Sequence, residues 1–288
     1  MKMLFACCLL LTGICLTSCD NEINLEAPYK EIGVIYGIID PSDSIHFVRI
    51  QKAFLGKGNI LEMAQIADSI YYPDILDVQL LRIKDGNILS SISLTRFDGP
   101  PKEDGVFPKT PNILYKTNGE VISRDSDYKI VVKNTQSGHV FSAQTPIVDS
   151  IKIIKPSIPS IALIQWASQF PQKVEYNTAV NGKIYNLTIR FKYQEEVIGS
   201  GIIVSKFVDW VFPNELVSNT SQIKTITLEI EGEDFYKFVG EAIKVDPNVI
   251  RYAGKLDFIF SGGAEFLANY VAINQATSSI LTTIPAIF

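Results

Sequence analysis

The strongest constraint on the fold is a run of ten residues in which apolar and polar side chains alternate strictly. Successive side chains of a β-strand point to opposite faces of its sheet, so this period of two requires a strand with one buried face. The chain therefore builds part of its core from β-sheet. The apolar positions are Tyr185, Leu187, Ile189, Phe191 and Tyr193, and the polar positions are Asn186, Thr188, Arg190, Lys192 and Gln194.

Shorter apolar runs, separated by turn residues, fill the stretch from residue 31 to residue 147. The turn Lys84–Asn87 contains Asp-Gly, a strong signal for a tight hairpin between two strands. Short strands at this spacing predict a β-sandwich, and we expect one over residues 31–147. Its predicted strands are 32–39, 45–50, 77–83, 88–94, 113–116, 128–133 and 140–143.

The strand pattern breaks between Phe54 and Pro73, where a helical pattern replaces it. Asn59 is followed three residues later by Glu62, which is typical of a capping box at a helix start. We therefore expect a helical insertion over residues 54–75. Its apolar residues fall on one helical face and are Ile60, Met63, Ala64 and Ala67.

Two tyrosines, Tyr71 and Tyr72, end this insertion directly before a proline. Loops on a rigid sandwich often carry binding residues, so this pair is the candidate for a partner-binding loop. The two tryptophans, Trp166 and Trp210, are expected to pack in the core instead.

A second domain is predicted after the proline-rich stretch 145–160, because proline cannot sit inside a sheet. We expect residues 148–288 to form a β-rich α+β domain with strands at 185–194, 202–210, 223–230 and 256–260. Two amphipathic helices are expected within it, one around 235–243 and one around 266–271. The chain stops on an apolar segment without polar closure, which suggests that the sequence is truncated at its C-terminus.

The first 18 residues have the pattern of an export signal. Lys2 is the only charge before Asp20, and a nearly continuous apolar stretch of about 14 residues, too short to span a bilayer, follows it. A basic start, a short apolar core and small residues before the cleavage point are typical of a secretory signal peptide.

The end of this segment, Leu16-Thr17-Ser18-Cys19, resembles the lipobox of bacterial lipoproteins. The resemblance implies cleavage between Ser18 and Cys19 and a covalent lipid on the Cys19 sulfur. Residues 19–30 would then form a polar tether between the lipid and the body. The alternative is an ordinary signal peptide with a chance cysteine.

All four cysteines lie within the first 19 residues, so the rest of the chain contains none. Disulfides, cysteine nucleophiles and thiolate metal sites are therefore excluded there. The formal charge is −5, and removal of residues 1–18 takes away one lysine and no acid, which gives −6. A mildly acidic body argues against a nucleic-acid partner.

The order of features resembles that of a family of uncharacterised Bacteroidota outer-membrane lipoproteins. A lipobox precedes an acidic tether and a strand-turn-strand opening, here Glu31–Ile50, and the segments 127–132 and 137–145 close the first domain. The closing strands resemble the last hairpin of a transthyretin-like or fibronectin-like sandwich. The resemblance implies a lipid-anchored outer-membrane protein, often found with TonB-dependent transporters. The Gly-rich C-terminal strand of the family is missing after Phe288, in line with truncation.

No catalytic constellation is evident in the sequence. The two histidines, His46 and His139, lie within or beside strands and have no partner at catalytic spacing. The segment Asp125–Asp127 lacks the spacing of a calcium loop and indicates a turn. Carboxylates such as Glu195 and Glu196 are plentiful, but their spacing does not show whether any two face each other.

The leading hypothesis is a non-enzymatic binding or accessory subunit, held in the outer membrane by its lipid and located beside a transporter or secretion assembly. We expect no cofactor apart from the covalent lipid on Cys19, and no metal. Whether the protein faces the periplasm or the cell surface is left open. Two alternatives remain: a surface glycan or peptide hydrolase that uses carboxylates, and a structural adhesin.

Overall fold

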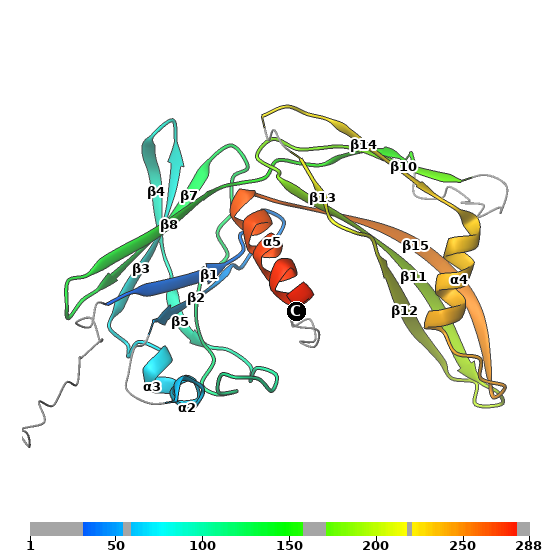
Figure 1. The fold of residues 1–288 in the computed structure, drawn as a ribbon, viewed down its shortest axis with the longest axis horizontal. Coiled ribbons are helices and arrows are strands. Elements are labelled where there is room, and N and C mark those ends of the chain that lie inside the picture. The colour runs from blue at the N-terminus through cyan, green and yellow to red at the C-terminus, as the bar shows by residue number, and fades with distance from the viewer. Residues whose placement is uncertain (1–30, 54–58, 158–170, 218–220, 281–288) are drawn as a thin grey trace, which may run out of the picture.

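The computed structural model describes residues 31–53, 59–157, 171–217 and 221–280. The protein is mainly β, with 48% of the described residues in strands and 13% in helices, which confirms the predicted fold class. The described strands form four antiparallel sheets (Figure 1). The export signal, Ser18, Cys19, the tether, Trp166 and residues 281–288 lie outside the described residues.

The N-terminal half is a sandwich of two four-stranded sheets, as predicted. One sheet has the order β1-β2-β6-β5, formed by β1 (Gly33–Gly37), β2 (Phe47–Lys52), β6 (Ile113–Lys116) and β5 (Thr95–Asp98). The other has the order β4-β3-β7-β8, formed by β4 (Asn87–Ser93), β3 (Leu76–Lys84), β7 (Asp127–Asn134) and β8 (Val140–Pro146). These orders correspond to strands A-B-E-D and C′-C-F-G of the immunoglobulin-type sandwich, an architecture shared by fibronectin type III domains.

The core of this sandwich lies between the inward faces of the two sheets. Ile50 of β2 and Leu80 of β3 are almost fully buried there. Tyr128, near the start of β7, is buried as well, and its hydroxyl oxygen accepts a hydrogen bond from the backbone N–H of Ser123 at 2.9 Å. A tyrosine at this place with a bond back to the preceding corner is the tyrosine corner of immunoglobulin-like domains. It fixes the turn into β7.

The hairpin predicted from Asp-Gly forms between β3 and β4. Asp85 and Gly86 both have positive φ, 51° and 77°, as a type I′ turn requires. Strand β5 was not predicted, since its four residues show no clear alternation.

The helical insertion contains two short helices, α2 (Ile60–Ala64) and α3 (Ala67–Ile70). Its predicted cap is confirmed: Asn59 Oδ1 accepts the backbone N–H of Leu61 at 3.0 Å, and Asn59 Nδ2 donates to Glu62 at 3.1 Å. The structure does not support Tyr71 and Tyr72 as a partner-binding loop. The two tyrosines are 4% and 5% exposed and belong to the sandwich core, because α3 ends against β2 and the chain then turns both rings inward.

The C-terminal half contains two sheets that share one core. The first has the order β14-β10-β9, formed by β14 (Thr225–Ile230), β10 (Gln172–Asn177) and β9 (Lys152–Lys155). In the second, the central β11 (Ile184–Val197) pairs with β12 (Ile203–Val211), β13 (Glu215–Leu216) and β15 (Val249–Gly263). The N-terminal half ends with β8 at Pro146, and the C-terminal half begins with β9 at Lys152. Among the described strands, no sheet contains strands from both halves.

The long strands β11, β12 and β15 form a curved sheet, and the helix α4 (Gly232–Ala242) lies against one face of it (Figure 1). Phe235 of α4 contacts Phe191 of β11, with ring centroids 5.7 Å apart, and Phe238 stacks on Trp210 at 5.4 Å. The predicted amphipathic helix is therefore confirmed, and Trp210 packs against the core as predicted, although it is only partly buried. The strand predicted at 256–260 is part of β15, which extends from Val249 to Gly263 because it pairs with almost the whole of β11.

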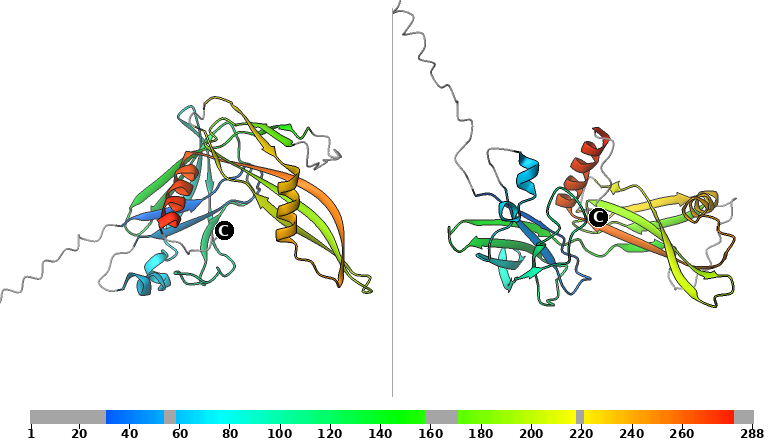
Figure 2. Two further views of the ribbon diagram at one scale, coloured as in Figure 1. Left: turned by 45° about the vertical axis from the view of Figure 1, so that its right-hand side comes forward. Right: turned by 90° about the horizontal axis from the view of Figure 1, so that it is seen from below.

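The last helix, α5 (Glu265–Ile280), follows the end of β15 and stands apart from the sheet in the view from below (Figure 2). Its predicted apolar stripe is only partly packed, because Phe266 and Tyr270 are 71% and 55% exposed whereas Leu267 and Val271 are half-buried. No helix among the described residues is long and apolar enough to cross a membrane.

Candidate functional site

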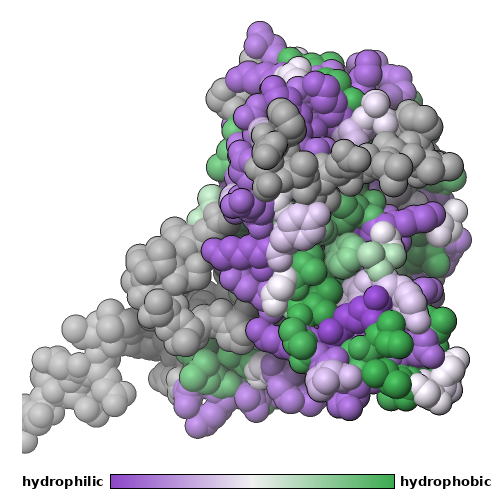
Figure 3. All heavy atoms as spheres, turned by 90° about the vertical axis from the view of Figure 1, so that its right-hand side faces the viewer, coloured by the Kyte–Doolittle hydropathy of each residue, from purple (hydrophilic) through white to green (hydrophobic). Residues whose placement is uncertain are grey.

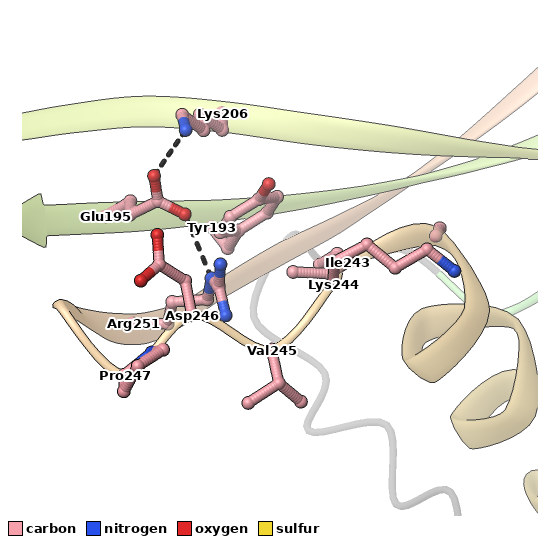
Figure 4. A pocket seen from close by; sticks show the side chains of 10 residues that line it. Tyr193, Glu195, Lys206, Ile243, Lys244, Val245, Asp246, Pro247 and Arg251 are labelled. Carbon is pink, nitrogen blue, oxygen red and sulfur yellow. Dashed lines mark hydrogen bonds and ion pairs between the residues drawn. The ribbon is translucent and has the colours of Figure 1, made fainter.

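A shallow pocket of about 400 Å³ lies at the far end of the curved sheet (Figure 4). Alternation along β11 puts Tyr193 and Glu195 on the face that carries the core residue Ile189. Lys206 lies opposite Tyr193 on β12, and Arg251 lies opposite Glu195 on β15. The segment 243–247 that follows α4 closes the other side.

The centre of the pocket is a carboxylate held between two cations. Glu195 accepts hydrogen bonds from Lys206 Nζ and from Arg251 Nε, the latter at 2.9 Å. The Glu195 side chain is only 14% exposed, so its charge is largely covered by these two partners. The Glu195 side chain of β11 thus links β12 and β15 to β11 at the far end of the sheet.

The electrostatics of this carboxylate do not suit acid–base chemistry. The hydrogen bond from Lys206 lowers the pKa of Glu195, and the bond from Arg251 adds to this against the opposing effect of burial. A glycosidase-type general acid needs a raised pKa instead. The other described carboxyl groups with a shifted pKa are also lowered, because the hydrogen bonds they accept outweigh the cost of burial; they are Glu31, Asp40, Asp125 and Asp209.

We expect the charge of Glu195 to contribute stability above its ordinary pKa, near 4.3, and to lose it as the pH falls through the lowered pKa of the folded state. Glu195→Gln should therefore flatten the rise of Tm between about pH 3 and pH 5. The measurement is Tm against pH, with Glu241→Gln at an exposed position of α4 as the control. Two identical profiles would contradict the assigned ion pairs.

Apolar side chains are exposed around this end of the sheet. Figure 3 shows the side of the molecule that lies on the right in Figure 1. Hydrophobic residues gather in its lower half, where the far ends of β11, β12 and β15 lie. Scattered exposed apolar residues are ordinary, but contiguous ones mark interaction surfaces. The exposed apolar residues at the tip are Val197, Ile198, Ile202, Ile203, Val245 and Ile250, and we call them the apolar tip.

The other candidates from the sequence do not converge on a site. His46 is buried, with its backbone bonded to Thr117, and His139 lies against Phe141, with ring centroids 5.8 Å apart. Asp125 is bonded to Arg82 and Lys84. The neighbouring carboxylate of Asp127 instead accepts from Gln144.

Among the described residues, no three His, Cys, Asp or Glu side chains are arranged to hold a metal ion. Tyr71 and Tyr72, buried in the N-terminal core, are remote in the fold from the pocket residues. Sequence reasoning missed Lys206 and Arg251, since their role depends on strand register. The alternation that ends at Gln194 does not single out Glu195 as a site residue, because Glu195 and Glu196 are both polar.

The sequence matches no protein-family model, and no curated protein matches it significantly.

Proposed function

We propose that the chain is a lipid-anchored lipoprotein of the bacterial outer membrane, related to the uncharacterised Bacteroidota family, that acts as a non-enzymatic binding or accessory subunit. The anchor is inferred from Leu16-Thr17-Ser18-Cys19 at the end of a short apolar segment. The proposed partner is another envelope protein, such as an outer-membrane transporter.

The observation that carries the binding role is the apolar tip beside the pocket. Its side chains are exposed to solvent at the end of a long rigid sheet, and exposed apolar clusters are typical of protein contact surfaces. The pocket carboxylate is unsuited to the role of general acid, because the hydrogen bonds from Lys206 and Arg251 lower the pKa of Glu195. This feature speaks against the hydrolase alternative, which requires a carboxyl group that keeps its proton.

The anchor is tested by replacing the lipid-bearing residue. Wild-type protein should fractionate with membranes and carry acyl mass on Cys19, with no residue before it. Cys19→Ala should remove the acyl mass and shift nearly all of the protein out of the membrane fraction, because anchoring needs the buried acyl chains. Mass spectrometry of both forms checks this, with Cys15→Ala as the matched control that should keep its lipid. An unmodified chain that starts at Met1 would refute the anchor.

The accessory role is tested by purification in mild detergent. We expect wild-type protein to co-purify with a defined envelope partner, and a charged substitution in the apolar tip, Ile198→Asp, to release it. Gly199, next in the same turn, has a positive φ of 80° and is left intact. Recovery of wild-type protein alone would contradict the accessory role and favour the adhesin alternative, which the exposed apolar tip also fits.

A further inference from the structure

Strand β12 offers an unpaired edge. It pairs with β11 along one side, and with no other described strand along the other. Its nine residues keep one regular register from Ile203 to Val211. The backbone N–H and C=O groups of the free side are therefore available to a further strand.

The other described edges are less suited to pairing. Every other edge strand is shorter than β12 apart from β15. In β15, Gly254 and Lys255 both lie opposite Lys192, so a bulge interrupts the ladder. Bulges and short edge strands are the devices that keep sheet edges from associating, and β12 has neither.

The two charged residues of β12 do not prevent its edge from pairing with another strand, because both already form ion pairs within their own sheet. Lys206 donates to Glu195, and Asp209 accepts two hydrogen bonds from Arg190 at 2.7 and 2.8 Å. A charged side chain usually protects an edge strand from association, because a second strand that paired there would have to remove water from the charge. Exposed apolar residues dominate instead: Ile203 54%, Val204 50%, Phe207 55% and Val211 62%.

We propose that β12 pairs antiparallel with β12 of a second copy of this chain, about a two-fold axis at Phe207. Phe207 is the middle residue of the strand, so this register pairs all nine residues and joins the β15-β11-β12 sheets of the two copies into one. No like charges face each other in it, because Ser205 meets Asp209 and Lys206 meets Val208. The outer pairs are Ile203 with Val211 and Val204 with Trp210. This inference goes beyond the proposed function and does not depend on the lipid anchor.

A second copy fits this edge better than an unrelated strand because the pattern is symmetric about its centre. Phe207 would lie against its own counterpart, and aromatic cross-strand pairs stabilise sheets. A register centred on Lys206 would instead place two ammonium groups together, which is destabilising. One strand pair is small beside the roughly 1,200–2,000 Å² that stable interfaces bury, so the dimer should depend on concentration.

The proposed axis makes a sharp prediction for cysteine cross-linking in the full chain. Directly opposed residues of antiparallel strands have Cα atoms about 4.5–5.5 Å apart, within the range of a disulfide. Phe207→Cys should therefore form a disulfide-linked homodimer under mild oxidation. Ile203→Cys and Val211→Cys should not, because each would lie about 26 Å from its own counterpart at roughly 3.3 Å per residue. A mixture of these two variants should form the 203–211 heterodimer.

The outcomes are read on non-reducing gels, with the unsubstituted chain as the background for the native cysteines. The mixture leaves Phe207 intact and so tests the register even if Phe207→Cys weakens the pairing. A homodimer at position 207, or the heterodimer in the mixture, supports the proposal. Absence of both, or equal cross-linking by every single variant, would overturn it. Sedimentation of the wild-type chain as a monomer at all concentrations would also overturn it.

Discussion

Replacing Gly254 by alanine is expected to destabilise the C-terminal half by about 3 kcal/mol, near the upper end for overpacking. A Cβ at this position would lie 2.4 Å from the backbone oxygen of Lys192, on the strand that faces it. Backbone atoms of a central strand cannot move aside as a flexible side chain can. The bulge in β15 therefore needs a residue without a side chain where the two backbones approach.

Gly240→Ala is the matched control for this substitution. Gly240 lies inside the helix α4, is exposed, and has no atom within 4 Å of an added Cβ. Alanine there should stabilise the protein by about 0.5–1 kcal/mol, because glycine loses more conformational freedom in a helix. Urea denaturation of both variants gives the comparison, and two changes of the same sign would refute the close approach at Gly254.

The bulge also shows what the sequence can and cannot predict. The alternation along 185–194 predicted β11 and its buried face, since the period of a strand is a local property. The extent of β15 could not be predicted, because most of its length is set by pairing with β11 rather than by its own pattern. The sequence 249–263 alternates poorly where Gly254 and Lys255 share one opposite residue.

Tyr71 and Tyr72 failed as a candidate site for a different reason. Their position before Pro73 correctly indicated the end of a helical segment, but burial depends on where that segment docks. The helix α3 ends beside β2, and both rings then fill the sandwich core. A local sequence pattern can predict where a helix or strand ends. It does not predict which of its residues tertiary packing will bury.

The pocket illustrates the same limit on the functional side. Glu195 was one of several carboxylates in the sequence, and nothing there separated it from Glu196. One position along a strand moves a side chain to the other face of the sheet. Glu195 therefore meets Lys206 and Arg251, whereas Glu196 accepts a bond from the hydroxyl of Tyr252 on the opposite face. Partners of this kind are fixed by register, which single-sequence patterns do not contain.

Ile189→Ala is expected to destabilise the C-terminal half by about 2–5 kcal/mol, the usual range for truncating a fully buried isoleucine. Ile189 is 0% exposed at the centre of β11 and lies in register with Trp210 and Phe258 on the core face. Ile259→Ala, on the solvent face of the same sheet at 39% exposure, should cost about 0.5 kcal/mol or less. Chemical denaturation monitored by tryptophan fluorescence separates the two.

The same variant tests whether the two halves are separate domains, since the buried residues of the N-terminal core, from Val48 to Ile147, are distinct from those around Ile189. Hydrogen exchange in Ile189→Ala should therefore speed up in β10, β11 and β15 while protection in β3 and β7 stays at the wild-type level. If β3 and β7 lost protection to the same degree, the two cores would unfold as one cooperative unit, and the predicted boundary near residue 147 would be wrong.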